Sequence, residues 1–199
     1  MRNRPIRTIA IALTAISAFS ASAKAQTPPS PAYTEKATGI SFPVRLGLLA
    51  FEGVEEYEDV RYGVAIKYSA IGVAGTLYIY NAGLKAIPSG VESPIHKDAM
   101  DMAVNDVKEV SRQGQYQDMV FDRGEIANLA ANEGGHRARH VSLAYTFQGI
   151  RWRSHIFVLG YKNQLVKLRF SYLDELRTSG EEQLKILTKW LNDAMKSGA

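Results

Sequence analysis

The spacing of hydrophobic and polar residues divides the chain into segments of two kinds. From Ile40 to Ala82 short alternating runs are separated by glycine, a pattern typical of strands. These runs predict three neighbouring strands over residues 48–57, 63–69 and 73–80. In the second of them, Val64, Ile66 and Tyr68 share one face.

A helical segment follows the strands. Ser93 and Pro94 supply an N-cap and a proline at the first helical position, and Gly114 marks the end, so a helix is predicted to run to about Gln113. Its predicted buried stripe consists of Ile95, Ala99, Met102, Ala103, Val107 and Val110.

The rest of the chain predicts more strands and a final helix. Residues 119–130 indicate one or two strands interrupted around Arg123 and Gly124, and three alternating runs between residues 137 and 172 indicate an antiparallel meander. The last helix is predicted to begin with a capping box of Ser179 and Glu182. Its predicted inner face carries Leu184, Leu187, Leu191 and Ala194. The order of elements predicts an α+β fold, a mainly antiparallel sheet with two principal helices packed on it.

The turn lengths within the meander predict its register. A two-residue turn at Gln148 and Gly149 places Tyr145 opposite Trp152 and Ser142 opposite His155. A three-residue turn over residues 161–163 then places Val158 beside Val166 and Arg169 beside His155. One apolar face results, and its predicted core is Val141, Leu143, Tyr145, Trp152, Ile156, Val158, Val166, Leu168 and Phe170.

The same register gathers basic residues on the opposite face. Arg151, Arg153, His155, Lys167 and Arg169 are predicted to lie side by side with no acidic residue on those strands. We expect this face to bind an anionic or carboxylate-bearing envelope component or another protein, with the arginines as bidentate donors. The alternative is a solvated face whose long basic side chains cover apolar neighbours, or one covered by the acidic strand over residues 52–59.

The first 25 residues have the three regions of a secretory signal. A basic start precedes an apolar run from Thr8 to Phe19 and small residues that end at Ala25. The apolar run is about 11 residues, shorter than the ~20 that span a bilayer, and no later run is longer. No twin arginine precedes this run, and without cysteine no lipoprotein anchor is possible. We expect Sec-type export to the periplasm or beyond, a Pro-rich tether over residues 26–37, and one domain over residues 38–199.

Composition narrows the class of protein. The chain has 199 residues, 46% of them hydrophobic and none of them cysteine, so disulfide scaffolds and wholesale disorder are excluded. The net charge of +4 equals the four basic residues of the leader, Arg2, Arg4, Arg7 and Lys24. The mature chain is therefore formally neutral, and nucleic acid is not an expected partner.

The sequence contains none of the common catalytic motifs. There is no Gly-x-Ser-x-Gly elbow, no Ser-x-x-Lys pair, no His-Glu-x-x-His helix and no phosphate-binding loop. Catalytic residues can still assemble in space, so a small hydrolase acting through His155 or His140 remains the alternative. A histidine beside a carboxylate or hydroxyl in an enclosed pocket would favour that enzyme, and a broad open groove would not.

Other polar clusters have structural explanations that outweigh a metal or cofactor. Glu52, Glu56 and Glu58 share strand parity and suit a charged edge, while Asp98 and Asp101 suit the start of a helix. His136 and His140 lie too far apart on a strand to share one ion, and His96 stands apart from both. Tyr57, Tyr62, Tyr68, Tyr78 and Tyr80 could bind a glycan or peptide, although aromatic residues are favoured in strands anyway.

The order of elements and one short motif carry a family resemblance. The segment Gly39-Ile40-Ser41-Phe42-Pro43 leads into the first strands, and with the succession of elements it resembles the Mog1/PsbP-type α/β sandwich. This resemblance implies a small non-enzymatic accessory or binding protein and assigns no functional residue. We therefore expect a non-catalytic binding or accessory protein of the cell envelope, without cofactor or metal.

Overall fold

The computed structural model describes residues 31–122, 124–130 and 135–197. The predicted leader and residues 26–30 lie outside this range. Before the first helix come the strands β1 Tyr33–Thr34, β2 Ser41–Phe42, β3 Arg45–Leu46, β4 Leu49–Glu56, β5 Val64–Ala70 and β6 Val73–Tyr80, with a 3-10 turn at Val60–Tyr62. After it come α1 Pro94–Arg112, β7 Gln117–Phe121, β8 Glu125–Asn128, β9 Arg137–Phe147, β10 Ile150–Tyr161, β11 Gln164–Leu173, a 3-10 turn at Asp174–Leu176 and α2 Arg177–Ser197.

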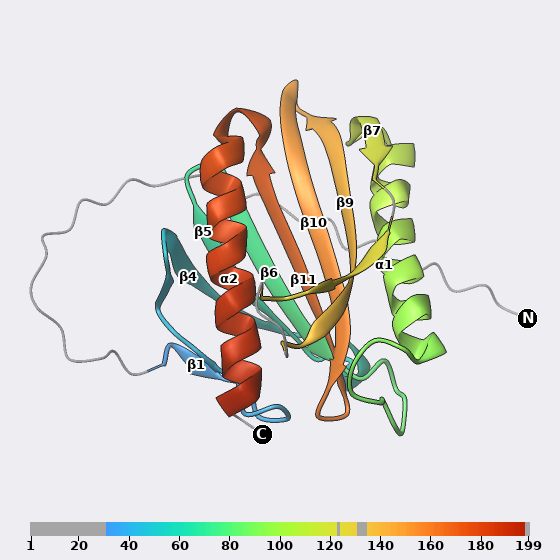
Figure 1. The fold of residues 1–199 in the computed structure, drawn as a ribbon. Coiled ribbons are helices and arrows are strands. Elements are labelled where there is room, and N and C mark those ends of the chain that lie inside the picture. Colours follow the sequence, from blue (N-terminus) through green and yellow to red (C-terminus); the bar gives the residue numbers. More distant parts are fainter. Residues whose placement is uncertain (1–30, 123, 131–134, 198–199) are drawn as a thin grey trace, which may run out of the picture.

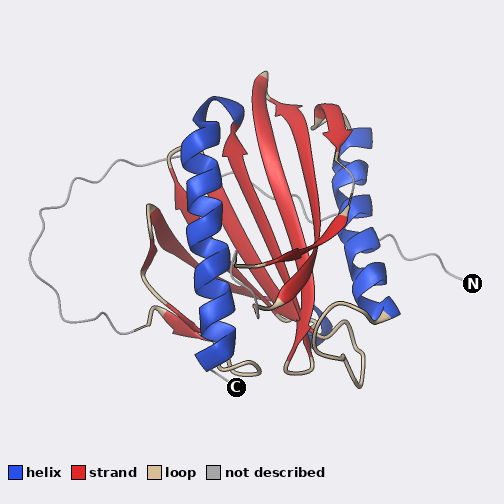
Figure 2. Cartoon of the chain, in the orientation of Figure 1, coloured by secondary structure: helices blue, strands red, loops and turns tan. Residues whose placement is uncertain are grey.

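The main sheet is antiparallel and has nine strands. Its order is β3-β4-β5-β6-β11-β10-β9-β7, and β8 pairs with β9 beside β7. The three-stranded meander of β9, β10 and β11 therefore lies in the middle of the sheet rather than at its edge (Figure 1). The predicted α+β fold with two principal helices is confirmed (Figure 2).

The two helices cover opposite faces of the sheet. On β10, Ile156 and Val158 pack with Ala103 and Val107 of α1, whereas Phe157 packs in the cluster that contains α2. Because successive side chains of a strand point to opposite faces, α1 and α2 must lie on different sides. Both faces of the meander are consequently buried, and the predicted single apolar face is wrong.

The register of the first hairpin matches its prediction, and that of the second does not. Gln148 and Gly149 both have positive φ in a two-residue turn, and Tyr145 lies opposite Trp152. The second turn also has two residues, Lys162 and Asn163, with φ of 46° and 59°, where three were predicted.

This difference of one residue reverses every side chain of β11 relative to β10. Ile156 lies opposite Arg169 instead of Leu168, and Val158 lies opposite Lys167 instead of Val166. The predicted core residues are nevertheless buried or half-buried, because apolar residues of β11 pack on the α2 side and those of β9 and β10 on the α1 side.

The first helix begins and ends as predicted but turns a different stripe inward. Ser93 accepts a hydrogen bond from the Ile95 amide, and Gln113 is the C-cap. The buried residues are His96, Ala99, Met100, Ala103 and Val107. Met102, predicted to be buried, is 64% exposed, because the buried face of the helix contains Met100 instead.

Three local predictions also change. A 3-10 turn leads directly into α2 at Arg177, so Ser179 lies inside the helix and is not its cap. The strand Tyr33–Thr34 pairs with β2, so ordered structure starts before the predicted Thr38. A bulge at Gly53, with φ of 141°, alters the parity of β4.

Candidate functional site

The structure divides the five predicted basic site residues between the two faces of the sheet. Lys167 and Arg169 lie opposite Val158 and Ile156 and share the α1 face. The other three residues, Arg151, Arg153 and His155, alternate with those apolar positions on β10 and share the α2 face. The predicted arrangement of all five side by side is therefore wrong.

Lys167 lies among tyrosine rings on the part of the sheet next to α1. Its Nζ is 4.3 Å from the ring centroid of Tyr78 and 5.9 Å from that of Tyr80. Burial and the neighbouring Arg169 guanidinium lower the pKa of Lys167, whereas the Asp106 carboxylate opposes them. The ammonium group is thus stabilised by ring faces rather than by an ion pair.

Arg169 has the same kind of environment two residues further along β11. Its guanidinium carbon is 5.8 Å from the Tyr116 ring centroid, and its Nη2 donates to the Tyr116 hydroxyl at 3.2 Å. The Tyr116 ring in turn lies 4.1 Å from the Tyr145 ring. Because residues 167 and 169 are one strand repeat apart, the two cations stand side by side on one surface.

We call this surface, formed by Lys167, Arg169, Tyr78, Tyr80 and Tyr116, the basic cradle. Burial raises the pKa of Tyr80 to about 12, so its hydroxyl stays neutral at physiological pH. None of the ion pairs within residues 31–122, 124–130 and 135–197 involves either cation of the cradle. Both residues keep part of their surface exposed to solvent, although their charged groups lie deep among neighbouring atoms.

Two carboxylates of the acidic strand β4 pair with side chains of β5 rather than with the two cations of the cradle. The bulge at Gly53 brings Glu52 and Glu55 to one face, where they bond Ser69 and Lys67 of β5. Lys67 Nζ lies 2.7 Å from Glu55 Oε2. The predicted shared parity of Glu52, Glu56 and Glu58 is wrong, and these carboxylates serve β5 rather than β11.

The basic residues of the α2 face have acceptors within the protein. Arg153 forms an ion pair with Asp174, which follows β11. Arg151 donates to the carbonyl oxygen of Asp118 at 2.8 Å and also contacts Thr146. Unlike the cations of the cradle, both of these guanidinium groups donate to an oxygen atom that does not belong to a tyrosine.

Two histidines of the α2 face form the centre of a hydrogen-bonded chain. His140 Nδ1 lies 3.2 Å from Glu125, His140 Nε2 lies 3.1 Å from His155 Nδ1, and His155 Nε2 lies 3.4 Å from the Tyr172 hydroxyl. We call Glu125, His140, His155 and Tyr172 the histidine relay. Sequence spacing could not have found it, because each residue comes from a different strand.

The remaining candidates have separate places. His96 is buried, and its Nε2 lies 3.0 Å from the carbonyl oxygen of Pro88. His136 packs against the Tyr161 ring at 5.8 Å and contacts neither relay histidine. Asp101 pairs with Lys97 on α1. Within the described residues, no three histidine or carboxylate side chains converge as metal ligands would.

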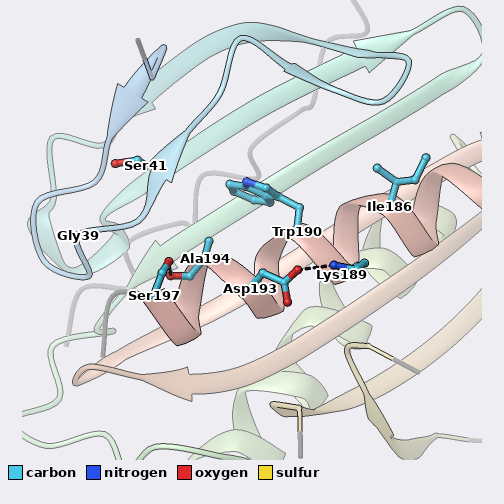
Figure 3. Close-up of a pocket in the computed structure, with 8 residues that line it drawn as sticks. All are labelled: Gly39, Ser41, Ile186, Lys189, Trp190, Asp193, Ala194 and Ser197. Carbon is cyan, nitrogen blue, oxygen red and sulfur yellow. Dashed lines mark hydrogen bonds and ion pairs between the residues drawn. The ribbon is translucent and has the colours of Figure 1, made fainter. Parts of the chain in front are cut away.

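Two surface cavities lie along α2. The larger, about 770 Å³, lies between this helix and the segment around Ser41, with Trp190 at its wall (Figure 3). The smaller lies between α2 and Leu129. Neither cavity is lined by a histidine, so the relay does not open into either of them. No helix of the described residues is long and apolar enough to cross a membrane.

Comparison with known proteins finds similarity among solved structures alone. No protein-family model and no curated protein matches the chain. Among solved structures, the chain is similar to cyanobacterial PsbP (CyanoP) from Synechocystis, with a TM-score of 0.47 and 14% sequence identity. The match covers 83% of this chain and 88% of that protein.

Proposed function

We propose that this chain is a non-catalytic binding or accessory protein of the cell envelope and that it binds an anionic ligand through the basic cradle. The observation that carries the proposal is the pair of Lys167 and Arg169, which face one surface with tyrosine rings as their nearest partners. A carboxylate or phosphate between them would receive charge-assisted hydrogen bonds from both. The envelope location rests on the leader of residues 1–25.

The binding experiment uses two probes, poly-L-glutamate for carboxylates and inorganic polyphosphate for phosphates. We expect the variant Lys167→Gln with Arg169→Gln to bind the preferred probe at least about tenfold more weakly, because each charged hydrogen bond contributes about 1.5–3 kcal/mol. Isothermal titration measures both affinities. The matched control is Arg151→Gln with Arg153→Gln, which removes the same charge from the α2 face and should bind like the wild type.

Equal losses in the two double variants would show that net charge alone attracts the probe, and the cradle would not be the site. A pair such as Arg153 with Arg169 is unsuitable for this experiment, because the two residues lie on opposite faces. Each variant must also keep its melting temperature within a few degrees of the wild type, so that a loss of binding is not a loss of fold.

Export is tested by the mass of the protein recovered from the envelope fraction. We expect cleavage after Ala25, so that the recovered chain begins at Gln26. A recovered mass that still includes residues 1–25 would contradict the predicted leader. A chain found only in the cytoplasmic fraction would contradict the envelope location while leaving the cradle as it is.

A hydrolase centred on His155 finds less support in the geometry. Ser142, which lies opposite His155, donates its hydroxyl hydrogen to Asp122 instead of to the imidazole. The hydroxyl that does approach His155 belongs to Tyr172, which is only 1% exposed. A nucleophile needs both an adjacent base and access to substrate, and neither hydroxyl has both.

A further inference from the structure

The larger of the two cavities along α2 is a groove between a helix and the edge of a strand. Gly39 and Ser41 line one side of it, and α2 lines the other (Figure 3). Among the described residues, β2 has β1 as its sole partner, in a two-stranded sheet separate from the main one. The second edge of β2 is therefore not occupied by a strand of that part of the chain. We call this cavity the edge groove.

The hydrogen bonds of this hairpin show which backbone groups lie on the second edge. The Glu35 amide donates to the Ile40 carbonyl oxygen at 2.9 Å, which makes these two residues a hydrogen-bonded pair. Such pairs alternate along an antiparallel ladder with non-hydrogen-bonded ones, so Thr34 and Ser41 form a pair of the second kind. Their hydroxyls meet at 3.0 Å, as the closer side chains of such a pair do. The N–H and C=O of Ser41 consequently point away from β1, on the edge that borders the groove.

The helix side of the groove carries a second apolar stripe, which the core covers only in part. Ile186, Trp190 and Ala194 follow one another at a spacing of four and project from α2 toward the segment of Gly39 and Ser41 (Figure 3). Ile186 is 37% exposed, and the other two are half-buried. The stripe is about 12 Å long, the length of about four residues of an extended chain.

We propose that the edge groove binds an extended peptide, which adds to β2 as a further strand and packs its side chains on the stripe of α2. An N–H and a C=O on one strand edge match the C=O and N–H of another strand, which is the geometry of a peptide backbone rather than of a glycan or a lipid. Alternate side chains of an added strand point to the same face, so every second residue of the peptide should be apolar and contact Trp190.

The rim of the groove is electrically balanced. Lys189 and Asp193, the charged residues that line it, form an ion pair with side chains that are 67% and 51% exposed. Neither sign of charge is in excess there, so the affinity for a peptide should change little with salt. The basic cradle, by contrast, should bind its ligand less tightly as salt increases. The edge groove lies at α2 and shares no residue with the cradle, so the two proposals stand or fall separately.

The experiment screens the mature chain against a synthetic library of blocked heptapeptides in which Leu, Val or Phe alternates with Thr or Ser. Fluorescence anisotropy of labelled peptides measures the affinities. For the tightest peptide, we expect Ser41→Pro to bind at least about fivefold more weakly, because proline has no N–H and leaves the peptide carbonyl unpaired. The matched control Ser41→Ala keeps the N–H and should bind within about twofold of the wild type.

A second pair of variants tests the helix side of the groove. Ile186→Ser should weaken binding of the same peptide at least about threefold, because it removes apolar surface that the peptide would cover. Ile126 on β8 is equally exposed, at 38%, and does not line the groove. Ile126→Ser should therefore bind like the wild type. Equal losses in the two variants would overturn the proposed contact with α2.

Analogues of the peptide test the backbone pairing even if Ser41→Pro does not fold. Single N-methylation at successive positions removes one N–H at a time, and we expect losses at the position that faces Ser41 but not at the positions on either side of it. Equal effects at every position, equal affinities of Ser41→Pro and Ser41→Ala, or a library without any binder would overturn the proposal. A wild type that is dimeric, with Ser41→Pro monomeric, would mean that a second copy covers the edge and would overturn it too.

Discussion

The two faces of the meander treat similar side chains in opposite ways. On the α1 side, Lys167 and Arg169 lie among tyrosine rings and form no ion pair within the described residues. On the α2 side, Arg153 pairs with Asp174, and His155 is held in a relay that ends at Glu125. Among the described residues, one face thus leaves its two cations without an ion pair, while the other face pairs its arginine internally. Whether a basic segment of sequence can bind a ligand therefore depends on how the fold pairs its cations.

The largest expected effect concerns the residue between the two cradle cations. Leu168 is fully buried on the α2 side, so Leu168→Ala should cost about 2–5 kcal/mol of unfolding free energy. Urea denaturation measures this loss. The control Ile71→Ala, at a side chain that is 77% exposed, should change the free energy by less than about 0.5 kcal/mol. A small effect at Leu168 would mean that β11 has the opposite register.

The relay face should lose stability in acid. The pKa of His155 is lowered to about 4 in the fold, below its ordinary value of about 6.5, so the unfolded chain binds more protons between these values. Its contribution is therefore complete above pH 6.5 and is lost as the pH falls toward 4, by up to about 3 kcal/mol. The difference between the wild type and His155→Gln, followed by urea denaturation across this range, isolates that contribution.

The cradle should show a conflict between stability and binding. Lys167→Met keeps the length of the side chain and removes a cation whose charged form is disfavoured by burial. We expect unfolding free energy to stay the same or rise by up to about 1 kcal/mol, while probe affinity falls. Thermal denaturation and titration measure the two quantities. A clear loss of stability would show that the ammonium group has an internal partner.

The smallest effect is expected at the ion pair of the α2 face. Arg153 and Asp174 are both partly exposed, and such pairs contribute about 0–1 kcal/mol. Arg153→Met should therefore change unfolding free energy by less than about 1 kcal/mol. A double-mutant cycle with Asp174→Asn measures the coupling. A coupling well above this range would place the pair in a more buried setting than its exposure indicates.

The hydrophobic pattern predicted the elements well because each has a clear local signal. Ser93 and Pro94 define the start of α1, and glycine-bounded alternation defines β5 and β6. The same pattern could not select the register of β11, since Leu165 and Val166 are both apolar and both buried. When helices cover both faces of a sheet, apolar side chains occur at both odd and even positions of a strand. The alternation of apolar and polar residues then no longer indicates which side chains point to which face.

By itself, the sequence determined the order and bounds of most elements, the α+β class and the register of the hairpin whose turn contains Gly149. These properties depend on residues that are close along the chain. The tertiary structure decided which face each basic residue joins, because one residue in the turn at Lys162 and Asn163 reverses the whole of β11. It also decided that Glu125, His140, His155 and Tyr172 meet, since strand pairing alone brings residues up to 47 positions apart into one hydrogen-bonded row.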